Sequence, residues 1–125
     1  FLGDCDSCGA ISKFYKDFVF DKILIVGLGM GLLPNYAKHI KNCSVIDVIE
    51  KNKEVIEYVN YLDNSINIIE ADAYDYIPLK KYDLIIFDLW WKEKDVTLKI
   101  KNSLNKIYKK ALTDNGKIIF PLIIK

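Results

Sequence analysis

The sequence has few features that would indicate a membrane protein, a secreted protein or a nucleic-acid-binding protein. No apolar run approaches the roughly 20 residues needed to cross a bilayer, and no secretory signal segment is found, so we expect no membrane contact. Three cysteines, an odd number, do not indicate a disulfide framework, and we expect a location in the reducing cytoplasm. The formal net charge of +1 provides no bulk attraction to nucleic acid.

The scarcity of cysteine and histidine also argues against a metal site. Cys5 and Cys8 form a C-x-x-C pair, but no second pair of Cys or His residues completes a four-ligand zinc site. Redox-active pairs usually begin a helix after a strand, and no predicted strand precedes this pair. We interpret the pair as structural or incidental, predict no metal, and expect residues 1–20 to form an arm or a short helix.

The remaining residues, 21–125, alternate between two kinds of segment. Apolar segments rich in Ile, Val and Leu are followed by segments with helical spacing, and no internal repeat divides the chain. This alternation predicts an α/β fold with a Rossmann-like, doubly wound, mostly parallel sheet of order 3-2-1-4-5 and helices on both faces. The predicted strands are 23–26, 45–49, 66–69, 82–87 and 117–124, the predicted helices are 32–41, 55–62 and 95–112, and residues 114–116 are the predicted turn before the last strand.

Three glycines, Gly27, Gly29 and Gly31, follow the first predicted strand. A buried strand that turns through glycines into a helix points backbone N–H groups at a ligand above the end of the strand. The dinucleotide motif G-x-G-x-x-G needs its third glycine at position 32, which is Leu32. The compact spacing therefore favours a ligand without phosphates.

An acidic residue follows each of the next three predicted strands: Glu50, Asp72 and Asp88. Because the carboxyl ends of parallel strands meet at one edge of the sheet, we expect these three side chains to lie around one crevice. An acid after the second strand can accept both hydroxyls of a ribose, and Asp72 can accept an adenine amine. A helix cap or a solvated strand end is the alternative interpretation for each acid alone.

The motifs ILIVGLGMG, DVIEKN, EADAYDYI and YDLIIFDLWW, in this order, resemble those of class I S-adenosylmethionine-dependent methyltransferases, and they look closest to the spermidine-synthase-like branch. The resemblance implies that the glycines line the methionine part of S-adenosylmethionine, that Glu50 holds the ribose, and that Asp72 with Ala73 contacts the adenine. The cofactor-binding residues that it implies are Gly27, Leu28, Gly29, Gly31, Glu50, Lys51, Asp72, Ala73 and Asp88.

The sequence departs from several branches of this fold. Spermidine synthases carry an acid within the glycine loop, where this chain has Met30, and a second acid where it has Trp91. The chain also lacks an Asn-Pro-Pro-Tyr loop for amino-group methylation and a Pro-Cys nucleophile for cytosine C5. The resemblance ends after the fifth strand, so we expect the acceptor-binding part to be missing, minimal or supplied by a partner.

We therefore predict an S-adenosylmethionine-dependent transferase, most simply a small methyltransferase. Asp88 is the candidate catalytic residue that orients or deprotonates the acceptor, although a structural or cofactor-binding role explains it equally. Trp90 and Trp91 either stack on an acceptor or cover an apolar edge. An aminopropyltransferase or another enzyme that consumes the same cofactor, and a non-catalytic binding module, are the alternatives.

The expected partners follow from the charge pattern and from the last strand. The lysines of the third predicted helix are interpreted as a solvated face, so we expect a small-molecule acceptor and not a nucleic acid. Residues 117–125 form an apolar strand that would lie at the edge of the sheet. Since exposed edges pair with other chains, we predict a homo-oligomer formed through this strand.

Overall fold

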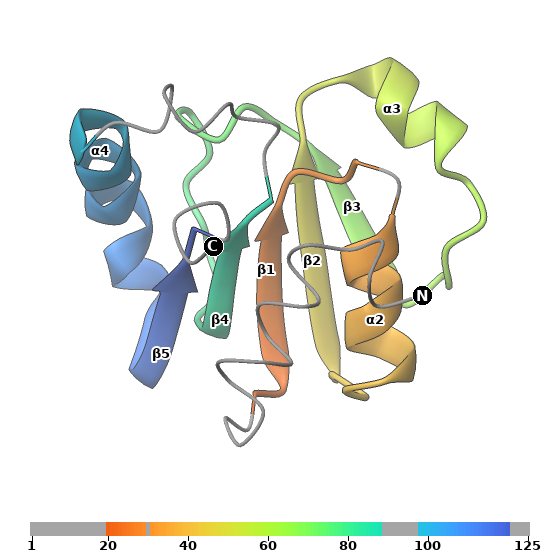
Figure 1. The fold of residues 1–125 in the computed structure, drawn as a ribbon, viewed down its shortest axis with the longest axis horizontal. Helices are drawn as coiled ribbons and strands as arrows, with labels where there is room; N and C mark the ends of the chain where they lie inside the picture. The colour runs from red at the N-terminus through yellow and green to blue at the C-terminus, as the bar shows by residue number, and fades with distance from the viewer. Residues whose placement is uncertain (1–19, 30, 89–97, 121–125) are drawn as a thin grey trace.

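The computed structural model describes residues 20–29, 31–88 and 98–120 (Figure 1). The predicted N-terminal arm except Phe20, the cysteine pair, Met30 and both tryptophans lie outside the described residues. The end of the predicted self-association segment, residues 121–125, lies outside them as well.

The described residues contain one five-stranded sheet of order β3-β2-β1-β4-β5, and all four pairings are parallel (Figure 1). The predicted α/β class, the Rossmann-like architecture and the strand order are confirmed. The strands β2 and β4 coincide with the predicted segments to within one residue, because apolar and β-branched residues predominate in each. The strands are β1 (Lys22–Val26), β2 (Val45–Glu50), β3 (Ile66–Glu70), β4 (Tyr82–Phe87) and β5 (Leu112–Ile119).

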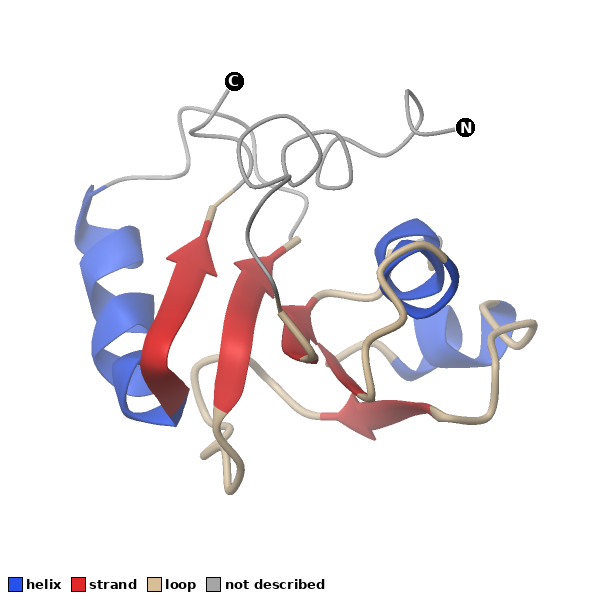
Figure 2. Cartoon of the chain, turned by 90° about the horizontal axis from the view of Figure 1, so that it is seen from below, coloured by secondary structure: helices blue, strands red, loops and turns tan. Residues whose placement is uncertain are grey.

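Helices cover both faces of the sheet. The helices α2 (Leu32–His39) and α3 (Lys53–Tyr58) pack on one face, and α4 (Leu98–Tyr108) with the 3₁₀ helix η3 (Lys109–Ala111) packs on the other. Figure 2 shows α4 beside β5, well apart from α2 and α3. A hydrophobic core lies on each face of the sheet, and successive apolar residues of β1 belong alternately to one core and to the other. These four residues are at most 1% exposed. Burial on both faces is the arrangement expected for a parallel sheet.

Several boundaries differ from the sequence predictions, and the predicted helix 32–41 is the shorter α2, which ends at His39. The predicted helix 55–62 is the shorter α3, which begins after Asn52, whose side chain accepts the Glu54 N–H at 2.9 Å. The predicted helix 95–112 ends at Tyr108, and the 3₁₀ turn η3 follows it.

The fifth strand begins at Leu112 and not at residue 117. Leu112 pairs with Tyr82 and Lys117 pairs with Leu84, so β5 places extra residues opposite one residue of β4. The predicted turn 114–116 is therefore a bulge within the strand. A Cβ on Gly116 would lie 2.9 Å from the Tyr82 carbonyl oxygen, which explains why glycine stands there.

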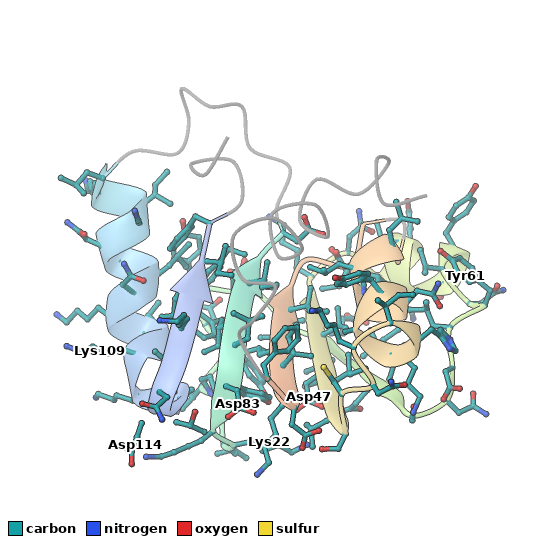
Figure 3. The ribbon with its side chains drawn as sticks, turned by 60° about the horizontal axis from the view of Figure 1, so that its bottom comes forward. Lys22, Asp47, Tyr61, Asp83, Lys109 and Asp114 are labelled. Atoms are coloured by element: carbon teal, nitrogen blue, oxygen red, sulfur yellow. The ribbon has the colours of Figure 1, made fainter. Side chains whose placement is uncertain are left out.

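Polar groups close the edge of the sheet at which the strands begin, and Figure 3 labels Asp47, Asp83 and Lys22 there. Asp83 Oδ2 accepts the N–H groups of Asp21 and Lys22, both at 2.9 Å. Asp47 is 2% exposed and accepts the Tyr82 hydroxyl at 2.6 Å, with the Lys80 ammonium at 3.2 Å. Asp83 thus joins β4 to the start of β1, and Asp47 joins β2 to β4 across β1.

Candidate functional site

The glycine-rich turn carries the chain from β1 to α2 across the opposite edge of the sheet. Gly27 has a φ of 109°, a conformation that residues with a Cβ rarely adopt. Its N–H donates to the Ile49 carbonyl at 2.8 Å, so the turn is attached to the end of β2. The turn therefore begins directly above the sheet and leaves space beyond the end of β1.

Gly31 ends this turn and serves a different purpose. It precedes the first residue of α2 with a φ of 81°, and a Cβ there would lie 2.8 Å from Val59 Cγ1 and 3.0 Å from the Tyr61 hydroxyl. Gly31 thus packs against the connection that follows α3. Leu28 is 1% exposed and belongs to the core beneath α2. These two residues of the predicted cofactor set do not line the cavity described next.

A cavity of about 720 Å³ lies at the carboxyl ends of β1, β2, β3 and β4. Such a volume is typical of sites for small organic ligands. It lies at the predicted edge of the sheet, where the strand order reverses next to β1. The predicted residues that line it are Gly27, Gly29, Glu50, Lys51, Asp72, Ala73 and Asp88.

Glu50 is held by the backbone on both sides. Its Oε1 accepts the Leu28 N–H at 2.9 Å, and its Oε2 accepts the Asn52 N–H at 3.0 Å. The carboxylate therefore fixes the glycine-rich turn to the start of α3. Each oxygen keeps a second acceptor position, so the group can still accept ligand hydroxyls.

Asp72 begins a tight turn after β3. Its Oδ1 accepts the Tyr74 N–H at 2.9 Å, and its carbonyl accepts the N–H groups of Asp75 and Tyr76, both at 3.0 Å. Asp72 therefore closes a turn and not a helix, and it also lies in the cavity wall. The Tyr108 hydroxyl donates to the next carbonyl, that of Ala73, at 2.7 Å.

Asp88 follows β4 on the same side of the cavity as the start of the glycine turn. Its N–H donates to the Val26 carbonyl at 2.8 Å, which extends the pairing of β4 with β1 by one residue. Asp88 and Gly27 are therefore attached to neighbouring positions at the end of β1. This arrangement puts Asp88, the candidate catalytic residue, next to Gly27 at the end of β1, and both residues line the cavity.

Several lining residues were not predicted. Glu54, Val55 and Tyr58 come from α3, outside the quoted motifs, whereas Tyr74 lies within the motif EADAYDYI without having been assigned a role. Tyr58 and Tyr74 are 76% and 50% exposed, and both contribute to the cavity. For Tyr74 the sequence carried a signal, since this aromatic residue lies two positions after Asp72, whereas Tyr58 lies eight positions after Glu50 and carried none. The remaining lining residues outside the predicted set are Val26, Ile49, Asn52, Glu54, Val55 and Ala71.

Charge on the cavity wall is mainly negative. The carboxylates are those of Glu50, Glu54, Asp72 and Asp88, and Lys51 is the basic residue among the described lining residues. Such a wall favours a ligand with net positive charge.

Neither a metal ion nor a membrane is indicated by the described residues. Within residues 20–29, 31–88 and 98–120, no group of three or more His, Cys, Asp and Glu residues could hold a metal ion. In the same ranges, no helix has the length and apolar character needed to span a bilayer.

No protein-family model and no curated protein matches the chain. Solved structures do match its fold. The plantazolicin methyltransferase BpumL, in complex with a pentazolic desmethylPZN analog and SAH, gives a TM-score of 0.70 at 19% identity, over 92% of this chain and 44% of BpumL. The DhpI–SAM–HEP complex gives a TM-score of 0.69 at 15% identity, over 94% of this chain and 53% of DhpI.

The chain thus spans about half the length of these proteins. At such identities the similarity concerns the fold and not the activity. These comparisons do not support the spermidine-synthase branch that the motifs favoured. The chain has the fold of the class I S-adenosylmethionine-dependent methyltransferases.

Proposed function

We propose that the chain binds S-adenosylmethionine in the cavity and takes part in methyl transfer to a small-molecule acceptor. The observation that carries this proposal is the Glu50 carboxylate, which lines the cavity while two backbone N–H groups fix both of its oxygens. A carboxylate held in this way is preorganised to accept the two hydroxyls of a ribose.

The chemistry of the cavity fits this ligand. At neutral pH, S-adenosylmethionine carries a sulfonium, an ammonium and one carboxylate, so its net charge is positive. The four carboxylates of the wall match that charge. Gly27 and Gly29 allow the methionine part to approach the backbone closely, because neither carries a Cβ.

The remaining roles follow from position. Asp72 and Ala73 lie in the wall where the adenine would be held, and Tyr58 and Tyr74 supply apolar ring surface for it. When bound, S-adenosylmethionine supplies an electrophilic methyl group to an acceptor nucleophile. Asp88 lies beside the glycines, where it can orient the acceptor or take up the proton that the acceptor loses.

The binding test compares two strand-end glutamates. Glu50 and Glu70 pair with each other at the ends of β2 and β3, but only Glu50 is among the described lining residues. Glu50→Gln should lower the affinity for S-adenosylhomocysteine about tenfold to a hundredfold, since a charge-assisted hydrogen bond is lost, and Glu70→Gln should leave it unchanged. Calorimetry measures both, and thermal unfolding checks that the variants are folded.

Product analysis tests the reaction. Purified protein is incubated with S-adenosylmethionine and candidate acceptors, and the products are identified by mass spectrometry. Formation of S-adenosylhomocysteine would support methylation. Formation of methylthioadenosine would instead indicate aminopropyl transfer. Binding without either product would indicate a non-catalytic module, and the absence of binding would overturn the proposal.

A further inference from the structure

The helix α4 reaches the ligand cavity through one described hydrogen bond, and we propose that Tyr108 is a positioning residue that orients the adenine-binding wall. Its hydroxyl donates to the Ala73 carbonyl at 2.7 Å. Ala73 lines the cavity, whereas Tyr108 is 0% exposed and lies behind it. The inference rests on the proposed function, because it assigns the base that this wall recognises.

The Tyr108 ring is fixed in the core between the sheet and α4. It lies edge-on to Phe87, with ring centroids 5.1 Å apart and an angle of 80° between the planes. Phe87 in turn stacks on Phe120 at 4.7 Å. Since Phe87 immediately precedes Asp88, this aromatic group joins α4 to the end of β4 beneath the cavity. A hydroxyl on so constrained a ring has little freedom to leave Ala73.

The bond fixes one side of a peptide group whose other side is also fixed. The peptide that joins Ala73 to Tyr74 has its carbonyl bound by Tyr108 and its N–H bound by Asp72 Oδ1 at 2.9 Å. Because a peptide group is planar, two such bonds define the orientation of the whole unit. They also set the direction of the Asp72 carboxylate, since Oδ1 is engaged with this peptide.

Orientation of this carboxylate determines which base it favours. A carboxylate accepts a hydrogen bond from the 6-amino group of adenine. It repels the 6-oxo group of hypoxanthine, which is an acceptor. We therefore infer that Tyr108 maintains a preference for a 6-aminopurine although it does not touch the ligand.

A second buried tyrosine in the same core provides a matched control. Tyr82 is 1% exposed, and its hydroxyl donates to Asp47 Oδ2 at 2.6 Å. This bond lies near the edge of the sheet at which the strands begin, away from the cavity (Figure 3). Tyr82→Phe and Tyr108→Phe each remove one buried hydroxyl and keep the ring, so the two variants differ in which edge of the sheet they affect.

The experiment measures affinity for S-adenosylhomocysteine and for S-inosylhomocysteine, in which the 6-amino group is replaced by oxygen. Tyr108→Phe should weaken S-adenosylhomocysteine binding about threefold to tenfold and leave the affinity for S-inosylhomocysteine nearly unchanged. The ratio of the two affinities, which measures the preference for the 6-amino group, should therefore fall. Tyr82→Phe should lower the unfolding temperature without altering the preference. A general loss of stability would weaken both ligands equally.

The inference is overturned if the ratio of the two affinities is unchanged in Tyr108→Phe, or if it falls equally in Tyr82→Phe. In either case, binding of S-adenosylhomocysteine by the wild type leaves the proposed function standing. If the wild type binds neither ligand, both fail. A measurement that needs no variant is hydrogen exchange of the Tyr74 amide in the wild-type protein. Slow exchange relative to an unstructured peptide supports a fixed peptide group, and exchange at the free-peptide rate overturns it.

Discussion

Replacing Gly31 with alanine should destabilise the fold through two separate effects. The residue has a φ of 81°, and a left-handed conformation costs a residue with a Cβ about 1–2 kcal/mol. The new methyl group would also lie 2.8 Å from Val59 Cγ1, and overpacking of this kind costs about 1–3 kcal/mol. The sum is about 2–5 kcal/mol, a large part of the roughly 5–15 kcal/mol that stabilises a domain.

A double-mutant cycle with Val59→Ala separates the two effects. Val59 is 2% exposed, so its truncation alone should cost about 2 kcal/mol from lost burial and the cavity that remains. In the double variant the contact with Val59 Cγ1 no longer exists, but the conformational strain at Gly31 and the contact with the Tyr61 hydroxyl persist. The double variant should therefore be more stable than the sum of the single effects predicts, by about 1–3 kcal/mol.

Urea unfolding of the four proteins measures these free energies, and thermal unfolding provides a second reading at about 4 °C per kcal/mol for a domain of this size. Additivity within roughly 0.5 kcal/mol would refute the contact between Gly31 and Val59. A Gly31→Ala protein as stable as the wild type would refute both effects. The result matters for the site, because Gly31 ends the turn whose other glycines line the cavity.

Three further predictions concern other parts of the chain. Asp47→Ala should cost about 3 kcal/mol in urea unfolding because it leaves the Tyr82 hydroxyl buried without its acceptor, whereas Lys80→Ala, which removes a half-exposed ammonium, should cost about 1 kcal/mol or less. Burial raises the pKa of the Cys43 thiol from 9.0 to about 12. Between these two pKa values the unfolded chain binds fewer protons than the folded one, so the free energy of unfolding should fall as the pH rises from 9 to about 12. This fall should be less steep in Cys43→Ala, which lacks the thiol. Sedimentation should show dimers formed through residues 117–125 at micromolar concentration, and a monomer throughout would contradict the predicted edge pairing.

The strands were predictable because each depends on a local pattern. The residues of β4 form one unbroken apolar run after Asp83, and the run gives the end of the strand at Phe87. The start of β5 was not predictable, because Asp-Asn-Gly is a turn signal in most contexts. Only the pairing of Leu112 with Tyr82 makes it a bulge, and that pairing joins residues far apart in the sequence.

The site was predictable to the extent that parallel strands bring their carboxyl ends together. That rule located Glu50, Asp72 and Asp88 around one cavity from their positions in the sequence. The Tyr108 contact with Ala73 could not be foreseen, since it depends on how α4 packs behind the sheet. Tyr108 looked like an ordinary residue of the apolar face, and only its hydroxyl distinguishes it.

Carboxylates at the two edges of the sheet each accept two backbone N–H groups, but their surroundings differ. Asp83 accepts two backbone N–H groups where the strands begin, and Glu50 accepts two where they end. Asp83 does not line the cavity described above, whereas Glu50 lies in its wall. The difference arises from Gly27 and Gly29, which carry the backbone away from the sheet without filling the space above β1. A strand-end acid therefore becomes a candidate ligand group only where the adjacent turn leaves room for a ligand, and the glycine spacing and the acids have to be interpreted together.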